Sequence, residues 1–141
     1  MALGQNRDLS AAWGAYDFKT QHGTKIEVKS AAYIQSWYQK GFSKISFTVR
    51  PTQAWHPETN TFDKEAKRQA DIYVFCLLKH RDQNTIDPLN LNQWEFYILA
   101  TNKIEKDFPR AKTLTLRKLK SLNPTICSFD KLPQYLKIET V

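Results

Sequence analysis

A turn followed by a strand is predicted by residues 21–29, QHGTKIEVK. Its glycine marks the turn, because glycine adopts backbone conformations that other residues avoid. After the turn, the apolar Ile26 and Val28 alternate with the charged Glu27 and Lys29, and alternation of period two is typical of a strand with one buried face. Side chains two positions apart on a strand point to the same side. We therefore expect Glu27 and Lys29 to share a polar face.

The residues before this turn supply the other arm of a predicted hairpin. Residues 13–18 read as an extended chain and include Asp17. The turn can fold the carboxylates of Asp17 and Glu27 towards one divalent metal ion, and Mg²⁺ prefers oxygen ligands of this kind. The backbone carbonyl of Val28 is a further candidate ligand. Lys29 would orient a metal-activated water or contact a phosphate, where a cation stabilises developing negative charge.

Plainer interpretations of these residues stay open. An acidic and a basic side chain two apart on a strand face form a common solvated pattern, and only the upstream Asp17 with the glycine turn favours metal chemistry. Gln35, shortly after the predicted strand, is a candidate for contacting the attacking water or a nucleic-acid backbone, and equally an ordinary polar residue. Tyr33 suits either base stacking or core packing.

The remaining patterns predict one domain over residues 1–141, of the α/β (α+β) class, built on a mixed sheet of about five strands. Further strands are expected at residues 44–50, 72–78 and 93–99. Residues 52–67 are polar and predict a long loop, with a helical turn near residues 64–69. The leucines spaced through residues 113–122 predict a helix.

The N-terminus is expected to lack part of the fold. Helix signal is scarce before residue 100, which is unusual for a sheet that needs cover on both faces. The first residues, MALG, read like the end of a helix with glycine as its C-cap. We therefore expect an N-terminal helix to be missing or truncated.

Charge and composition narrow the classes of partner. The chain has 141 residues, a formal net charge of +7 and 41% hydrophobic residues, the balance of an ordinary globular domain with an affinity for polyanions. Nucleic acid is the commonest such partner. No stretch reaches the roughly 20 apolar residues of a membrane span, and neither a P-loop nor a GxGxxG motif is present. Two distant cysteines without metal or disulfide spacing, and no signal-peptide core, favour the cytoplasm.

Three basic residues are candidates for contacting a nucleic-acid backbone. Arg50 ends a predicted strand beside the long polar loop, whereas Arg117 and Lys118 lie in the basic stretch of the predicted C-terminal helix. Phosphate contacts of this kind position a nucleic acid without reading its sequence. An ordinary solvated face is the alternative interpretation.

The pattern of Asp17, Glu27 and Lys29 resembles that of the PD-(D/E)XK nuclease superfamily, which has the restriction-endonuclease-like fold. The wider sequence is similar to a bacterial subfamily of it in three runs: IEVKSAAYIQSW at residues 26–37, ADIYVFC at 70–76 and QWEFY at 93–97. The Glu-Val-Lys-Ser-Ala-Ala-Tyr run is fairly specific, whereas Glu-x-Lys alone is not. Tyr16 replaces the proline of the superfamily name.

The resemblance implies a Mg²⁺-dependent endonuclease that hydrolyses DNA, with Mn²⁺ as an alternative ion. Asp17 and Glu27 would be metal ligands and Lys29 the catalytic lysine, on a core of order α-β-β-β-α-β. A homodimer is an open arrangement, because many duplex cutters of this fold pair two sites. Two other functions stay open: a nuclease fold that binds nucleic acid without cutting it, and an interaction domain. Mg²⁺-stimulated cleavage separates the enzyme from the first, and salt-sensitive DNA binding separates both from the second.

Overall fold

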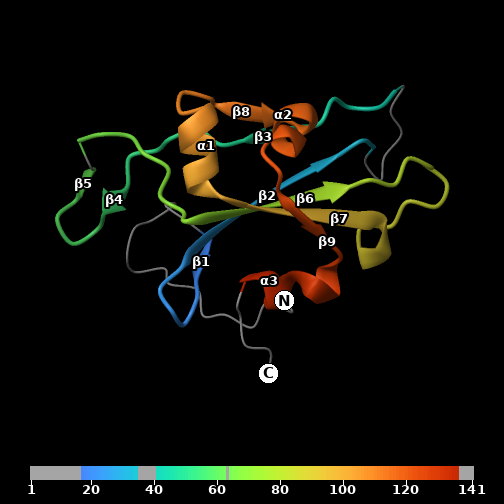
Figure 1. The fold of residues 1–141 in the computed structure, drawn as a ribbon, viewed down its shortest axis with the longest axis horizontal. Coiled ribbons are helices and arrows are strands. Elements are labelled where there is room, and N and C mark those ends of the chain that lie inside the picture. The colour runs from blue at the N-terminus through green and yellow to red at the C-terminus, as the bar shows by residue number, and fades with distance from the viewer. Residues whose placement is uncertain (1–16, 35–40, 63, 137–141) are drawn as a thin grey trace.

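The computed structural model describes residues 17–34, 41–62 and 64–136. A five-stranded sheet runs through the centre of the molecule in the order β1-β2-β6-β7-β9 (Figure 1). The strands are β1 (Phe18–Lys19), β2 (Lys25–Ala32), β6 (Ile72–Leu78), β7 (Trp94–Ala100) and β9 (Thr125–Cys127). β2 and β6 run parallel, and the other neighbouring strands pair antiparallel. The fold is therefore of the α+β class with a mixed sheet and few helices, as predicted.

β6 occupies the middle of the sheet because its side chains are apolar on both faces. Its buried side chains alternate between the two cores: Tyr73, Phe75 and Leu77 on one side, Val74 on the other. A nearly continuous apolar run is typical of a strand that is covered on both faces. The buried strand predicted for residues 72–78 is confirmed.

One face of the sheet is covered by a layer of short strands and helices (Figure 1). The layer consists of β3 (Ser46–Thr48), β8 (Thr113–Thr115), α1 (Thr101–Asp107) and α2 (Leu116–Ser121). Its buried side chains include Phe47, Ile104, Leu114 and Leu119, which share one core with Tyr73, Phe75, Tyr97 and Leu99 of the sheet. Each large side chain buried there contributes about 1.5–3 kcal/mol, so this face holds the main core.

The opposite face is covered by η2 (Phe129–Lys131) and α3 (Leu132–Leu136). The smaller core on this side comprises Phe18, Ile26, Val74, Phe96, Leu132 and Leu136. Because successive residues of a strand point to opposite faces, the assignment of Ile26 to this core leaves Glu27 on the other face, towards the α1–α2 layer.

The part of the chain that connects β3 to β6 forms a two-stranded ribbon, which projects from the side of the molecule (Figure 1). It is formed by β4 (Trp55–His56) and β5 (Thr61–Phe62), and a bridge between Thr52 and Lys67 closes its base. Asn60 turns its tip with φ of 53°, a conformation that asparagine tolerates better than most residues. The remaining helical turn is η1 (Leu91–Gln93), just before β7.

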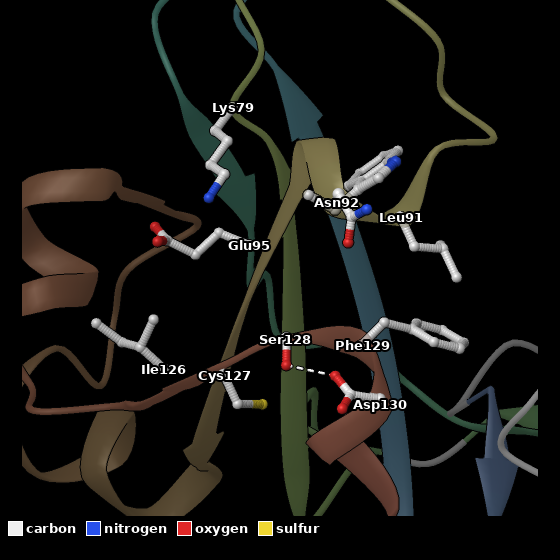
Figure 2. A pocket seen from close by; sticks show the side chains of 10 residues that line it. Lys79, Leu91, Asn92, Glu95, Ile126, Cys127, Ser128, Phe129 and Asp130 are labelled. Atoms are coloured by element: carbon white, nitrogen blue, oxygen red, sulfur yellow. Dashed lines mark hydrogen bonds between the residues drawn. The ribbon is translucent and has the colours of Figure 1, made fainter.

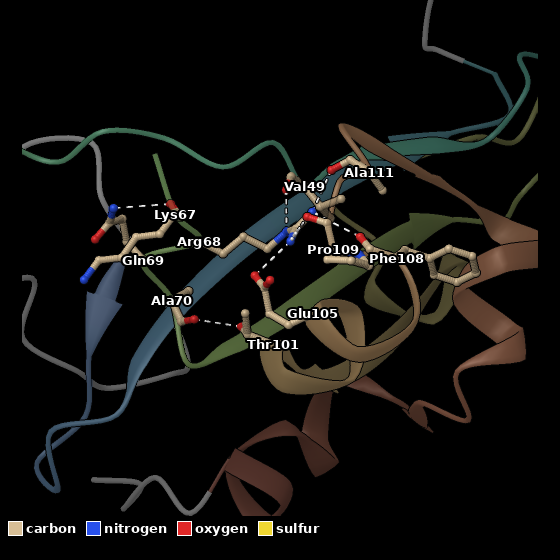
Figure 3. Close-up of polar contacts among 10 residues, drawn as sticks. All are labelled: Val49, Lys67, Arg68, Gln69, Ala70, Thr101, Glu105, Phe108, Pro109 and Ala111. Atoms are coloured by element: carbon tan, nitrogen blue, oxygen red, sulfur yellow. Dashed lines mark hydrogen bonds and ion pairs between the residues drawn. The ribbon is translucent and has the colours of Figure 1, made fainter. Parts of the chain in front are cut away.

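Arg68 ties the ribbon's base to the α1–α2 layer (Figure 3). Its side chain is fully buried, pairs with Glu105 at 2.8 Å, and donates to the carbonyl of Val49 at 2.8 Å. It also donates to three carbonyls that follow α1, those of Phe108, Pro109 and Ala111. A buried guanidinium is tolerated because all of its donors can be satisfied in this way.

The hairpin predicted from residues 21–29 is confirmed. Gly23 has φ of +86°, which lies in the left-handed region that glycine enters without steric cost. Thr20 reinforces the turn, since its hydroxyl accepts the N–H of Thr24 at 3.1 Å. The strand after the turn continues as far as Ala32, and the strand at residues 93–99 is present as β7.

Three local predictions are corrected. The strand expected at residues 44–50 pairs with β8 in the covering layer, and the fifth strand of the central sheet is β9. Residues 52–67 hold the ribbon rather than a loop, and no helical turn forms among the described residues of 64–69. The helix of residues 113–122 begins only at Leu116, because the Thr115 hydroxyl caps it by accepting the N–H of Lys118 at 3.2 Å.

The expected truncation at the N-terminus falls on residues that lie outside the described ranges. Among the helices that are described, none has the length and apolar character needed to cross a bilayer.

Candidate active site

The β1–β2 hairpin places Asp17 beside Glu27. Phe18 pairs with Ile26 at the outermost paired position of β1. Asp17 directly precedes this strand, and its carboxyl shares a side-chain hydrogen bond with Glu27. The Asp17 N–H donates to the Ile26 carbonyl at 2.9 Å, and Asp17 Oδ2 accepts the N–H of Val28 at 2.6 Å. The backbone and the side chain of Asp17 are thus both held by β2.

The carboxyl of Glu27 sits in a mostly buried position beside two charged neighbours. Burial raises its pKa to about 7, Lys29 opposes this rise, and Asp17 adds to it through its charge and a hydrogen bond between the side chains. Lys29 Nζ lies 3.7 Å from Glu27 Oε2, and the two side chains are 30% and 18% exposed. Two carboxyls and an amine therefore lie together at one partly exposed place on the sheet.

Tyr73 forms the buried wall of this spot. It pairs with Glu27 across the parallel β2–β6 ladder, and it is only 2% exposed. Burial raises the pKa of Tyr73 to about 12, with a further contribution from the charge of Glu27. Its phenol therefore stays protonated at neutral pH. Sequence reasoning missed Tyr73, because a tyrosine within an apolar run reads as core.

Asp71 fixes the start of β2 against the start of β6. Asp71 Oδ2 accepts the N–H of Lys25 at 3.0 Å, and the Asp71 N–H donates to the Lys25 carbonyl at 2.8 Å. This pair of bonds sets the register that brings Glu27 beside Tyr73. Asp71 is thus a positioning residue: it bonds Lys25, which lies two residues before Glu27, and it lies itself two residues before Tyr73.

The other predicted site residues do not join this cluster in the described structure. Gln35 lies outside the described residues. Arg50 follows β3, and Arg117 and Lys118 belong to α2, so all three sit on the layer that covers the sheet; each is exposed. Lys118 Nζ lies 5.4 Å from the centre of the Phe108 ring.

No cluster of three or more histidine, cysteine, aspartate or glutamate side chains is arranged for metal binding within the described residues. Asp17 and Glu27 thus form a pair of carboxylates. This pair suits an ion that fills its remaining positions with water and backbone oxygens, as Mg²⁺ commonly does.

Two cavities among the described residues lie outside the carboxylate pair. A cavity of about 650 Å³ opens where β7 begins (Figure 2), and its walls include Lys79, Trp94, Glu95 and Phe129. It lies at the opposite end of the sheet from Glu27. A second cavity of about 630 Å³ lies next to the start of β6. The residues that line it include Pro51, Arg68, Asp71, Thr101 and Pro109.

Comparison with known proteins assigns the class of the chain. Residues 3–118 match the family model described as bacteriophage T4 endonuclease IV. Because this match covers most of the chain, the protein is a DNA endonuclease by class. The chain belongs to the bacteriophage T4 endonuclease IV family, and the matched range includes all the predicted site residues. No curated protein and no solved structure matches the chain.

Proposed function

We propose that the chain is a metal-dependent endodeoxyribonuclease of the PD-(D/E)XK superfamily, whose site is built by Asp17, Glu27 and Lys29. The observation that carries this proposal is that the carboxyl of Asp17, which directly precedes β1, shares a hydrogen bond with that of Glu27 on β2, with Lys29 Nζ 3.7 Å from Glu27 Oε2. Endonuclease family membership supplies the reaction class. The metal ion and the superfamily are the parts that this proposal adds.

The electrostatics of the pair fit a divalent cation, Mg²⁺ or Mn²⁺. The raised pKa of Glu27, about 7, shows that a second negative charge beside Asp17 in this half-buried place is unfavourable without compensation. A divalent cation supplies that compensation, because two ionised carboxylates then face a charge of opposite sign. Without a cation, the positive charge of Lys29 offsets only part of the negative charge of the two carboxylates.

Each residue has a defined role in this proposal. When bound, the metal ion neutralises the phosphate and lowers the pKa of a bound water. Asp17 and Glu27 hold the ion through carboxylate oxygens. The Val28 N–H points towards Asp17, and since the N–H and C=O of a strand residue point to the same side, the Val28 carbonyl also faces the β1 side and is a suitable third ligand. Lys29 holds the attacking water or the scissile phosphate.

More distant residues complete the proposed nuclease. Gln35 contacts the water or the DNA backbone, while Arg50, Arg117 and Lys118 contact phosphates from the covering layer, where all three basic side chains are exposed. We further propose a cytoplasmic enzyme that acts either alone or as a homodimer. Sedimentation with and without DNA distinguishes these two arrangements.

Metal-dependent cleavage by Glu27 variants tests the proposal. Glu27→Gln and Glu27→Ala are expected to remove Mg²⁺-dependent DNA cleavage while the fold, checked by circular dichroism, is retained. Glu58→Gln is the matched control, because Glu58 is exposed at the tip of the ribbon. Unchanged Mg²⁺-dependent cleavage by Glu27→Ala would sink the assignment. A wild-type chain that binds DNA but shows no metal-stimulated cutting would favour the non-cutting binding module.

A further inference from the structure

A group of aromatic and basic side chains lies at the end of the sheet that is remote from the carboxylate pair. Tyr33 follows β2 directly, and Arg81 follows β6 by three positions. Ala32 pairs with Leu78 at the end of the parallel ladder, so the carboxyl ends of these two strands emerge side by side. Figure 1 shows both arrowheads pointing to the same edge. The two residues that follow the strands are thereby brought together.

Phe42 is the third member of this group. Its neighbour Ser43 donates its N–H to the carbonyl of Tyr33 at 2.8 Å, which holds this segment against the end of β2. The rings of Tyr33 and Phe42 are 6.3 Å apart and inclined at 73°. The guanidinium carbon of Arg81 lies 4.0 Å from the centre of the Tyr33 ring and 5.5 Å from that of Phe42. We call Tyr33, Phe42 and Arg81 the stacking platform.

The exposure of the platform is unlike that of a core cluster. Tyr33 packs partly against the main core, but Phe42 is 59% exposed. Arg81 is exposed and makes ring contacts without an ion pair to any described carboxylate. Asp82, its acidic neighbour in the chain, is engaged in the next turn, where it accepts the N–H of Asn84 at 3.0 Å. A large apolar ring and a guanidinium plane are thus both presented to solvent.

The charge around the platform favours a polyanion. Lys44 and Lys79 are exposed beside Phe42 and Arg81 in the chain. Phosphates are attracted by such amines, while aromatic rings and the guanidinium plane of arginine stack on nucleobases. An apolar peptide would use the ring of Phe42 alone, whereas DNA uses both the ring and the charges. The assigned endonuclease class makes DNA the ligand that fits.

We propose that the stacking platform binds an unpaired nucleobase of the DNA substrate, at a site separate from the cleavage centre. Glu27 and Tyr33 are six positions apart along β2, which corresponds to about 20 Å at 3.3 Å per residue. That is roughly the length of six stacked nucleotides at about 3.4 Å each. One strand can therefore reach from the carboxylate pair to the platform. This inference rests on the proposed function only for the distance to the cleavage centre.

Binding measured without metal tests the platform independently of catalysis. The probes are a fluorescein-labelled single-stranded oligodeoxynucleotide of about 20 nucleotides, an oligomer of equal length in which every site is abasic, and the corresponding blunt duplex. Fluorescence anisotropy is measured in EDTA, so that no metal-dependent cleavage occurs. The variants are Phe42→Ala and Arg81→Lys, with Phe62→Ala as the matched control, because Phe62 is a similarly exposed phenylalanine on the ribbon.

Phe42→Ala is expected to weaken binding of the base-bearing strand by about 5- to 150-fold, the range of one lost stacking contact. Binding of the abasic oligomer and the duplex should stay within about twofold of wild type, and the salt dependence should keep its slope, because phosphate contacts are unchanged. Arg81→Lys, which keeps the charge but loses the plane, should weaken the same probe selectively. Phe62→Ala should match wild type with every probe.

Two results would overturn the platform. One is a Phe42→Ala variant that binds the base-bearing strand as tightly as Phe62→Ala does. The other is equal weakening for all three probes, which indicates a general defect rather than lost stacking. Failure of the proposed metal mechanism looks different, because cleavage by wild type would then be independent of metal or of Glu27 while the binding difference persisted.

Discussion

Asp17 accepts the backbone N–H of Val28 through Oδ2 at 2.6 Å, so the first carboxylate of the site is fastened to the strand that carries the second. This bond closes the open end of the β1–β2 hairpin, where the two-residue β1 supplies only two paired positions. The geometry of the carboxylate pair therefore depends on the same contact that stabilises the hairpin.

Substitution of Asp17 should separate its structural role from its proposed metal-binding role. Asp17→Ala loses the bond to Val28 and is expected to lower the free energy of unfolding by about 1.5–3 kcal/mol, the usual contribution of a hydrogen bond to a charged group. Asp17→Asn keeps an oxygen acceptor and should lose much less stability, yet it should lose metal-dependent cleavage as fully as Asp17→Ala. Urea unfolding and a cleavage assay measure the two effects. Equal stability of both variants would contradict the structural role.

The pKa of Glu27 predicts how stability varies with pH. The folded-state pKa of Glu27 is about 7 and the ordinary pKa of its carboxyl is 4.5, so between these values the folded state binds more protons than the unfolded state. Stability in the absence of metal should therefore fall as pH rises through this window. Urea unfolding of wild type and of Glu27→Gln should show this slope in wild type and a weaker one in the variant.

Metal binding should reverse this trend. A carboxylate must be deprotonated before it binds a metal ion, so the Mg²⁺ concentration for half-maximal cleavage should fall as pH rises through about 7, the pKa of Glu27. Thermal unfolding with and without Mg²⁺ gives a second readout, since an ion that binds only the folded state stabilises it. Mg²⁺ stabilisation that is the same in wild type and Glu27→Gln would contradict metal binding by Glu27.

Lys29 should matter for cleavage more than for metal binding. Lys29→Met is expected to reduce the cleavage rate by about 100- to 1000-fold, the effect of removing one group that stabilises charge in a transition state. The pKa of Glu27 should rise further in this variant, because Lys29 lowers it in wild type. Lys131→Met, at an exposed lysine of η2, serves as the control. A full cleavage rate for Lys29→Met at saturating Mg²⁺ would remove Lys29 from the mechanism.

Arg68 should be essential to stability and not to chemistry. Arg68→Met leaves the buried carbonyl of Val49, the partly buried contacts at Pro109 and Ala111, and the Glu105 carboxylate without their donor, and a buried acceptor without a partner costs about 1–3 kcal/mol. A loss of about 3 kcal/mol or more in the free energy of unfolding is expected from denaturant titration. The neighbouring exposed Lys67→Met should change stability by less than about 0.5 kcal/mol.

The site could be predicted from the sequence where it depends on local rules. The glycine turn and the alternation around Glu27 and Lys29 are short-range patterns, and both survive in the fold. The buried run of β6 is equally local, because its apolar residues leave little choice except the middle of a sheet. Asp17 joins this set through the same glycine turn, which folds it back towards Glu27, and the resemblance to a nuclease family supports its inclusion.

Apart from the start of α2, which the local Thr115 cap decides, the places where prediction is wrong depend on long-range partners. Alternation predicts a strand at residues 44–50 but not that its partner is β8. β9 has three residues, and the ribbon strands at Trp55 and Phe62 have two each, too few to show a period of two. The raised pKa of Glu27 could not be predicted either, since burial arises from packing against Tyr73 and the covering layer.

The amino-acid sequence by itself determined the hairpin, the central buried strand and the residue types of the carboxylate pair, because a turn and a period of two are properties of neighbouring residues. Only the tertiary structure decided that Tyr33, Phe42 and Arg81 form one surface, since the parallel pairing of β2 with β6 is what brings the ends of these distant segments together. Contacts between segments separated by about 50 residues depend on the packing of the whole sheet, and that packing also sets the protonation of Glu27.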